Sequence, residues 1–125
     1  MTSEINGLTE AVIGAAIEVH RELGPGLLES AYQRALEHEL TLRGVRFAAQ
    51  KGCSVTYKGL LLEGAYRLDL LVEDRLVVEV KAVDALSEVH EAQILTYLKF
   101  SNCRIGLLLN FRARMLKDGL RRLAL

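Results

Sequence analysis

Two acids and a lysine fall at a spacing that could bind a metal and hydrolyse a phosphodiester. Asp69 lies in an apolar run of residues 66–72, and Glu79 and Lys81 lie in a second run that ends at residue 81. Alternation along strands places Arg67 with Asp69, and Lys81 with Glu79, opposite to the apolar side chains. Two hard carboxylates can converge on Mg²⁺ or Mn²⁺, while Lys81 handles water or the scissile phosphate.

The alternative for these charges is the solvated face of an exposed edge strand. Leu and Val dominate both runs, which is typical of interior strands. Ionised groups buried in a sheet are costly unless they are paired, hydrogen-bonded or bound to a metal. The pattern therefore favours a functional role for the charged face over a solvated one.

The metal hypothesis requires a particular pairing of the two strands. Asp69 and Glu79 are directly opposite if paired residue numbers sum to 148. This pairing needs an odd loop, such as the three residues Glu73, Asp74 and Arg75, or a bulge. A regular two-residue turn would place the carboxylates on opposite faces. On the other side of the first strand, alternation predicts one apolar face that carries Tyr66, Leu68, Leu70 and Val72.

The remaining chain predicts helices and strands that could position this hairpin. Helical periodicity covers residues 3–22, and a break at Gly24, Pro25 and Gly26 precedes a second helix over residues 27–43. Strands are predicted at residues 46–57 and 60–72, with a turn at Lys58 and Gly59. A helix at residues 88–100 and a buried strand at 104–110 follow. Residues 111–125 fit either a short strand pair or a helix.

Polar side chains interrupt the apolar stripes of two predicted helices. Glu29 shares a face with Tyr32, Leu36 and Leu40, although a carboxylate in a first helical turn is also favoured by the helix dipole alone. Gln93 and Tyr97 lie in the middle of the stripe of the 88–100 helix that is expected to meet the sheet.

These residues form three ordered motifs, and together they resemble the PD-(D/E)XK nuclease superfamily from about residue 5 to residue 120. Asp69-x9-Glu79-x-Lys81 resembles the signature that names the superfamily. The run from Gly26 through Glu29 to Tyr32 resembles the G-x-x-E-x-x-Y motif of a family of small, mostly prokaryotic proteins. Gln93-x-x-x-Tyr97 resembles the Q-x-x-x-Y element of one nuclease branch, and Thr96 replaces the Asn usual in the G-x-x-E-x-x-Y family.

The resemblance implies an α/β fold, with a PD-(D/E)XK nuclease-like core of a four-stranded mixed sheet flanked by helices. It further implies that Asp69, Glu79 and the Val80 carbonyl bind Mg²⁺ or Mn²⁺, that Lys81 orients water or stabilises charge, and that Glu29 completes the acidic cluster. Contacts with nucleic acid would come from Gln93 and Tyr97, and Arg67 is a further candidate.

Two functional hypotheses follow, and a purely structural α/β protein is a third. The first is a metal-dependent nuclease that hydrolyses DNA or RNA. The second is a non-catalytic nucleic-acid- or protein-binding module on the same fold. Because the chain has only 125 residues, we expect a single domain, residues 1–125, whose specificity would require a homodimer or a partner protein.

Composition bears on where the protein is located, on the state of its cysteines and on what it could bind. No apolar run reaches the ~20 residues of a membrane span, and the first residues lack a signal-peptide pattern, so we expect a cytoplasmic protein that does not enter membranes. Cys53 and Cys103 are expected to be reduced thiols. The formal charge is zero, but residues 99–125 hold 7 basic residues and 1 acidic residue. This basic tract fits a phosphate backbone or the protein's own acidic helices equally well.

Overall fold

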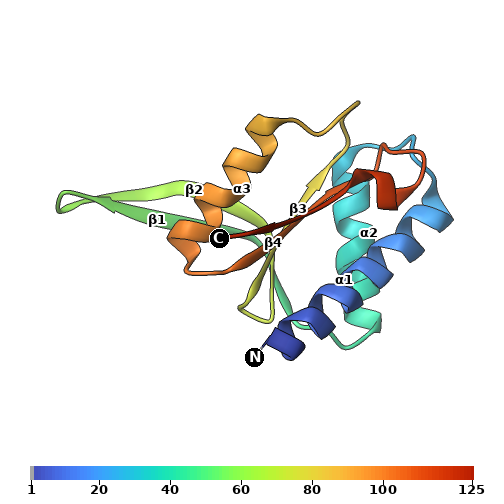
Figure 1. Cartoon of the computed structure of the whole chain (residues 1–125), viewed down its shortest axis with the longest axis horizontal. Coiled ribbons are helices and arrows are strands. Elements are labelled where there is room, and N and C mark those ends of the chain that lie inside the picture. The colour runs from blue at the N-terminus through green and yellow to red at the C-terminus, as the bar shows by residue number, and fades with distance from the viewer. Residues whose placement is uncertain (1) are drawn as a thin grey trace.

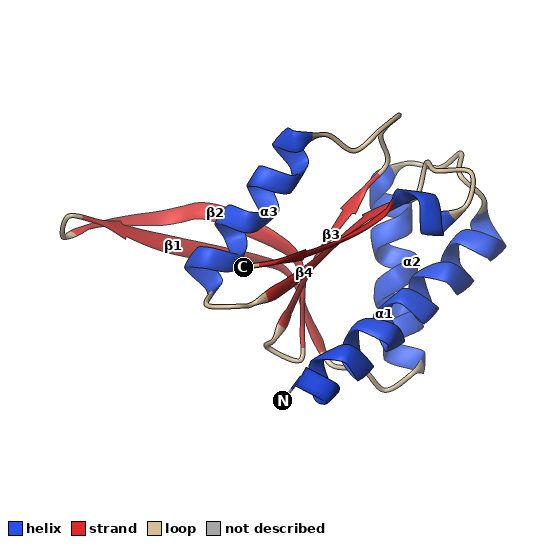
Figure 2. Cartoon of the chain, viewed as in Figure 1, coloured by secondary structure: helices blue, strands red, loops and turns tan. Residues whose placement is uncertain are grey.

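The computed structural model describes residues 2–125, with side chains from Glu4 onward, and contains one mixed sheet of five strands with helices on both faces (Figure 1, Figure 2). The strand order is β1-β2-β3-β4-β5; β3 and β4 are parallel, and the other neighbours are antiparallel. The elements are α1 (Thr2–Leu23), α2 (Glu29–Leu42), β1 (Phe47–Tyr57), β2 (Leu60–Val72), β3 (Leu76–Lys81), α3 (Glu88–Ser101), β4 (Ile105–Asn110), the 3₁₀ helix η1 (Leu116–Gly119) and β5 (Leu120–Ala124).

The predicted helices and the first four strands are confirmed, but the predicted sheet of four strands is wrong. The fifth strand, β5, comes from the segment that the sequence left undecided, and it pairs antiparallel with β4. Its sequence, Leu-Arg-Arg-Leu-Ala, does not alternate between polar and apolar residues, so it carries no period-two signal. The tight approach of η1 to β4 requires Gly119, because a Cβ there would lie 2.4 Å from the Asn110 carbonyl oxygen.

Helices α1 and α2 cover one face of the sheet and form the larger core (Figure 2). Its buried residues include Val12, Val19, Tyr32, Leu36, Leu70, Val78, Leu107, Leu109 and Phe111. Helix α3 lies over the other face, where Ile94 and Leu98 pack with Val77 and Leu108. The close packing of α3 depends on Gly106, since a Cβ on that residue would lie 2.7 Å from Cδ1 of Ile94. Within residues 2–125, no helix is long and apolar enough to cross a membrane.

The β2–β3 hairpin has the pairing that the metal hypothesis requires. The paired residues are Leu70 with Val78, Leu71 with Val77 and Val72 with Leu76, so their numbers sum to 148, as those of Asp69 and Glu79 do. A three-residue turn connects the strands, and Glu73 and Asp74 adopt positive φ values of 52° and 58° there. The predicted odd loop is therefore confirmed.

One prediction about β2 is wrong: its apolar residues do not share a single face. Leu70 and Val72 belong to the α1/α2 core, whereas Leu68 is buried, and Tyr66 half-buried, in the cluster under α3. The change falls at Asp69, where the ladder to β3 has ended and where Gln50 in the neighbouring strand has a φ of 52°. Both neighbours of β2 are therefore irregular at Asp69, and its strict alternation does not continue through this point.

Beyond this point, β1 and β2 continue as a two-stranded ribbon that projects from the body of the molecule (Figure 1). The predicted turn at Lys58 and Gly59 is confirmed, with φ values of 47° and 86°. Two central residues with positive φ match the twist of the flanking strands. We call the ribbon outside the helical layers, residues 54–65, the arm.

Candidate functional site

Asp69 and Glu79 meet where β2 separates from β3. Immediately past the last ladder pair, the Asp69 backbone N–H donates to Oε2 of Glu79 at 2.9 Å, and the Val80 N–H donates to Oδ2 of Asp69 at 2.8 Å. Each carboxylate thus occupies the position that a carbonyl of the opposite strand would take in a continued ladder. The two side chains are held across the same gap by reciprocal backbone bonds.

Burial makes this pair electrostatically unusual. Glu79 is only 3% exposed, and burial, followed by the negative charge of Asp69 and then of Glu29, raises its pKa from 4.5 to about 8. The pKa of Asp69 is also raised, chiefly by burial, although the Val80 N–H and the charges of Lys81 and Arg67 oppose that rise. Two carboxylates that share one site cannot both ionise without cost. Burial and mutual repulsion therefore favour retention of a proton by the pair over ionisation of both carboxylates.

Lys81, Gln93 and Tyr97 lie at this same site. The Nζ of Lys81, two residues after Glu79 on β3, donates to Oε1 of Gln93 on α3 at 3.3 Å. One turn further along α3, Tyr97 stacks on Tyr66 with ring centroids 5.0 Å apart. Burial and the charges of Glu79 and Asp69 raise the pKa of Tyr97, while a hydrogen bond with Gln93 lowers it. The structure therefore brings these predicted site residues to the face that carries the acids.

Glu29 lies at the rim of this site and not inside it. Its side chain is exposed at the start of α2, and its Oε1 accepts the N–H of Ala82 at 3.2 Å, directly after β3. It is close enough to contribute to the raised pKa of Glu79. Across residues 2–125, however, no three His, Cys, Asp or Glu side chains form a group that could hold a metal ion. The expected cluster of three acids is reduced to a pair with Glu29 nearby.

Val80 and Arg67 flank the pair on the two strands. The N–H of Val80 points toward β2, and the N–H and C=O of a strand residue lie on the same edge, so its carbonyl faces the same gap. Arg67 is exposed on β2, two residues before Asp69. Its positive charge lowers the pKa of Asp69, which places the guanidinium near the mouth of the site.

Two buried polar residues support the site and were missed by sequence reasoning. Gln33 on α2 is 8% exposed, and its Nε2 donates to the backbone carbonyl of Asp69 at 3.1 Å. Asn110, at the end of β4 beside Lys81, accepts the N–H of Val83 and donates to the Val83 carbonyl. An available signal for Gln33 was its position on α2 beside Tyr32 and four residues after Glu29, within the helix expected to face the sheet.

The tyrosine of the G-x-x-E-x-x-Y run has a structural role. Tyr32 is fully buried and stacks on Phe111 with ring centroids 4.7 Å apart. Its hydroxyl donates to the Gly24 carbonyl and accepts the N–H of Leu27 at 3.0 Å. It thereby fixes the loop that leads into α2 and the position of Glu29 at the start of that helix.

The basic tract is partly engaged by the protein's own acidic groups. Arg121 lies 3.8 Å from Glu91 on α3, and Arg112 lies 3.6 Å from Asp84. These pairs are exposed, and such pairs contribute little stability. Folding of the tract against the protein's own acids is therefore observed for two of its seven cations.

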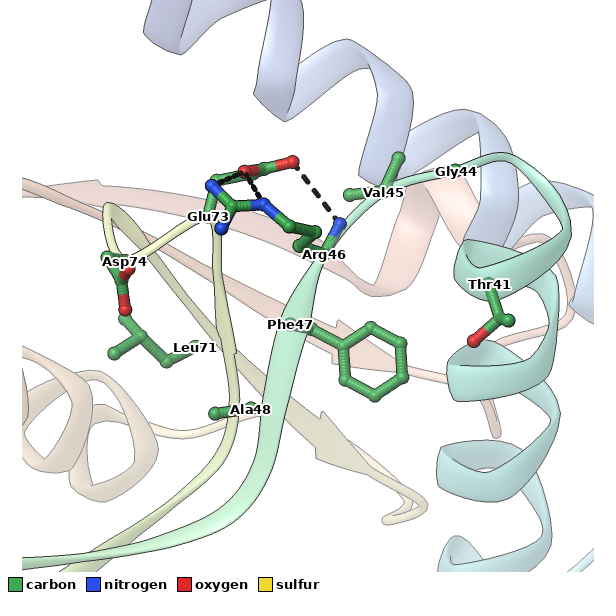
Figure 3. A pocket seen from close by; sticks show the side chains of 9 residues that line it. All are labelled: Thr41, Gly44, Val45, Arg46, Phe47, Ala48, Leu71, Glu73 and Asp74. Atoms are coloured by element: carbon green, nitrogen blue, oxygen red, sulfur yellow. Dashed lines mark hydrogen bonds and ion pairs between the residues drawn. The ribbon is translucent and has the colours of Figure 1, made fainter.

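One hollow of the surface lies away from the acids, near the β2–β3 turn (Figure 3). Arg46 and Glu73 form an ion pair there at 2.8 Å. The lining residues are Thr41, Gly44, Val45, Arg46, Phe47, Ala48, Leu71, Glu73 and Asp74. None of them is a predicted site residue. The carboxylates of Asp69 and Glu79 lie toward the other end of β3, away from this turn.

Comparison with protein families agrees with the observed α/β fold. A model of the PD-(D/E)XK nuclease superfamily matches residues 6–123, and the chain belongs to that superfamily. Comparison with curated proteins and with solved structures gave no significant match. The family therefore defines a nuclease-like fold, and the residues above supply the arguments about its chemistry.

Proposed function

We propose that the chain is a metal-dependent nuclease of the cytoplasm that hydrolyses phosphodiester bonds of DNA or RNA with Mg²⁺ or Mn²⁺. The observation that carries the proposal is the reciprocal bonding of Asp69 and Glu79 at the gap between β2 and β3. One oxygen of each carboxylate accepts a backbone N–H, so the other can be offered to a cation. Two aligned carboxylates in a buried position need such a partner to ionise together.

The donor set fits Mg²⁺ or Mn²⁺ better than a softer metal. Asp69, Glu79 and the Val80 carbonyl offer only oxygen, and Mg²⁺ is usually bound by one or two carboxylates while it keeps several waters. A cluster of three side chains is therefore not required. When bound, the cation supplies a Lewis acid that polarises the phosphate and lowers the pKa of water.

The protein's own groups then have distinct roles. Asp69 and Glu79 are fixed by backbone donors and so need little rearrangement, which is the physical basis of electrostatic preorganisation. Lys81 carries the nearest positive charge on β3, and Gln93 holds its Nζ, so it can orient water or stabilise charge on the phosphate. Glu29 acts from the rim, where its carboxylate adds negative potential beside Ala82.

Contacts with the substrate are assigned to α3 and to the outer part of β2. Gln93 and Tyr97 of α3 lie beside Asp69 and Glu79, and Arg67 is exposed nearby on β2. A guanidinium and polar side chains suit phosphate and sugar contacts, which position a nucleic acid without reading its sequence. We assign the chain to the G-x-x-E-x-x-Y group within the superfamily on the run from Gly26 to Tyr32, where Tyr32 anchors the loop before Glu29.

The test is hydrolysis of labelled single- and double-stranded DNA and RNA by purified protein with Mn²⁺, Mg²⁺ or EDTA. The proposal predicts metal-dependent cleavage of at least one substrate, lost in Glu79→Gln by 100-fold or more. The matched control is Glu10→Gln, on an exposed position of α1, which should cleave like the wild type.

The alternative, a non-catalytic nucleic-acid- or protein-binding module, predicts a different result in the same experiment. It gives no cleavage under any metal condition, together with retention of the nucleic acid that is equal in wild type and Glu79→Gln. That pair of results would contradict the nuclease proposal.

A further inference from the structure

The loop that follows β4 carries two arginines to the end of the sheet where Lys81 lies. β3 and β4 are parallel, and their last pair is Lys81 with Asn110. The chain turns at once, because the N–H of the next residue donates to the Lys81 carbonyl at 2.9 Å. We call residues 111–115 the β4 loop. Its arginines, Arg112 and Arg114, are exposed. Two cations thus extend from a segment that is bonded to the strand of the candidate site.

Hydrogen bonds fix the backbone of the β4 loop. The N–H of Arg112 donates to Oδ1 of Asn110 at 3.2 Å, and the N–H of Ala113 donates to the Asn110 carbonyl at 3.3 Å. On α1, Nε2 of His20 donates to the Ala113 carbonyl at 2.8 Å, since a carbonyl oxygen can only accept. The first loop residue, Phe111, is fully buried. The fold therefore sets the positions from which the arginines extend, and little ordering of the loop is needed for binding.

The same bonds determine which groups of the loop can bind a ligand. The N–H groups of residues 111–113 all donate to protein acceptors, so they do not form an anion-binding nest. Ala113 packs inward, because a Cβ added at Gly119 would lie 2.9 Å from its own Cβ. The exposed guanidinium groups remain, and a guanidinium binds a phosphate through two parallel N–H donors. The ligand that the loop suits is therefore a phosphate.

The present partner of Arg112 holds it weakly. Its Nη1 lies 3.6 Å from Oδ1 of Asp84, and the Asp84 side chain is 99% exposed. This separation exceeds that of a hydrogen bond, and exposed ion pairs contribute little stability. Arg114 has no ion-pair partner among residues 4–125. Both guanidinium groups are therefore available to an incoming phosphate.

Two other arginines of the basic tract lie elsewhere. Arg104 is exposed at the start of β4, at the opposite end of that strand from the β4 loop. Arg122 is exposed on β5, and its Nη2 donates to Oδ1 of Asn6 on α1 at 2.9 Å. Position relative to β3 therefore distinguishes the two arginines of the β4 loop from these two, although all four carry the same charge.

We propose that Arg112 and Arg114 bind phosphates of the nucleic-acid strand whose scissile phosphodiester lies at Asp69 and Glu79. The inference rests on the proposed nuclease function and adds a second binding element to it. The acids act on one phosphate, while the β4 loop holds phosphates that flank it. The substrate surface then extends from α3 across the end of β3 to the β4 loop. Such contacts position the strand and carry no sequence information.

The experiment measures binding of labelled single- and double-stranded DNA and RNA by fluorescence anisotropy, in EDTA, over a salt series from about 50 to about 300 mM. The test variant combines Arg112→Gln with Arg114→Gln. The matched control combines Arg104→Gln with Arg122→Gln, which removes the same charge away from the site.

The test variant should bind at least tenfold more weakly than the wild type at about 100 mM salt. The slope of log K against log salt should be smaller by about 1.4–1.8, because two phosphate contacts are lost. The control variant should change the affinity less than threefold and keep the wild-type slope. Thermal melts establish that every variant is folded.

Removal of the competing acid should have the opposite effect. Asp84→Asn should tighten binding by about twofold to fivefold, because Asp84 no longer competes for Arg112. Glu10→Gln removes a negative charge from an exposed position of α1 and should bind like the wild type. Equal tightening by both variants would show that only net charge matters and would contradict the proposal.

Two further outcomes overturn the β4-loop site: equal weakening by the test and control variants, and a wild type that binds none of the nucleic acids. Cleavage with Mn²⁺ separates this inference from the nuclease function. A wild type that cleaves, with a test variant that binds and cleaves like the control, contradicts the β4-loop site alone. A preserved contrast in binding without any cleavage supports the site and contradicts the nuclease function.

Discussion

The inner half of β2, residues 68–72, lies between two helical layers, whereas the outer half, residues 60–65, projects beyond both. Both halves contain several leucines. Leu68 and Leu70 are fully buried, but Leu60, Leu61 and Leu62 are exposed. The boundary between the halves lies close to Asp69, where the chain changes which face it presents to the helices.

This difference shows that tertiary layers, and not the strand sequence, decide what an apolar strand residue does. In the inner half, the layers exclude water, so the carboxylates of Asp69 and Glu79 have raised pKa values and need a partner. In the outer half, the same residue types face solvent. Hydrophobic burial contributes stability only where a covering layer exists.

The largest expected contrast is between leucine truncations in the two halves. Leu70→Ala should lower the free energy of unfolding by about 2–5 kcal/mol, because it leaves a cavity in the core under α1 and α2. Leu60→Ala in dilute protein should change it by less than about 0.5 kcal/mol. Urea unfolding of both variants measures the contrast, and similar losses would mean that the outer half is buried in solution.

Removal of the buried acid should stabilise the free protein. Glu79 binds a proton more tightly when folded, with a pKa of about 8 against an ordinary 4.5. The folded state therefore holds the extra proton, and the free energy of unfolding falls as pH rises from about 4.5 to about 8. Glu79→Gln cannot ionise and lacks this fall.

The advantage of Glu79→Gln over wild type should accordingly grow from near zero at pH 5 to about 1–3 kcal/mol at pH 8.5, in EDTA. Urea titrations at several pH values give the comparison, and Glu63→Gln in the exposed arm is the control that should show no such trend. An advantage that is constant with pH would mean that Glu79 ionises normally in the fold.

A smaller effect is expected where α2 supports the inner half. Gln33→Leu should cost about 1–2 kcal/mol, because the Asp69 carbonyl loses its buried donor. Arg34→Ala, at the exposed neighbouring position, should cost less than about 0.5 kcal/mol. The reading is a thermal melt of each variant, and equal costs would argue that the amide of Gln33 does not hold the strand at Asp69.

Local patterns in the sequence predict much of the fold. Helical periodicity, the Gly24 to Gly26 break and the Lys58 and Gly59 turn are all found as predicted. The fifth strand was left undecided between strand and helix because Leu120 and Leu123 are three residues apart, a helical spacing that pairing with β4 overrides. The change of face in β2 was not predicted because it falls where the ladder to β3 ends, and the sequence of β2 does not mark that point.

The site was predictable where residues share a hairpin and less so where helices must dock. Whether Asp69 and Glu79 share a face depends only on the number of residues in the turn between their strands. The turn has three residues, and the structure places the two side chains together. The distance of Glu29 from the two acids depends on how α2 docks on the sheet, and in the structure its side chain lies at the rim of the site. The position of Gln33 on α2 was an available signal, but its bond to a backbone atom 36 residues away could not be read from the sequence.

The claim that Asp69 and Glu79 bind a divalent cation is tested most directly by thermal melts of wild type and Asp69→Asn, each in EDTA and in millimolar Mn²⁺. A cation that binds only the folded state adds about 2.7 kcal/mol at a hundredfold excess over Kd, so Mn²⁺ should raise the wild-type Tm by several degrees. Asp69→Asn should lose this shift and cost little stability in EDTA, because one of two repelling carboxylates is gone. An unchanged wild-type Tm, or a shift that survives in Asp69→Asn, would contradict the metal site.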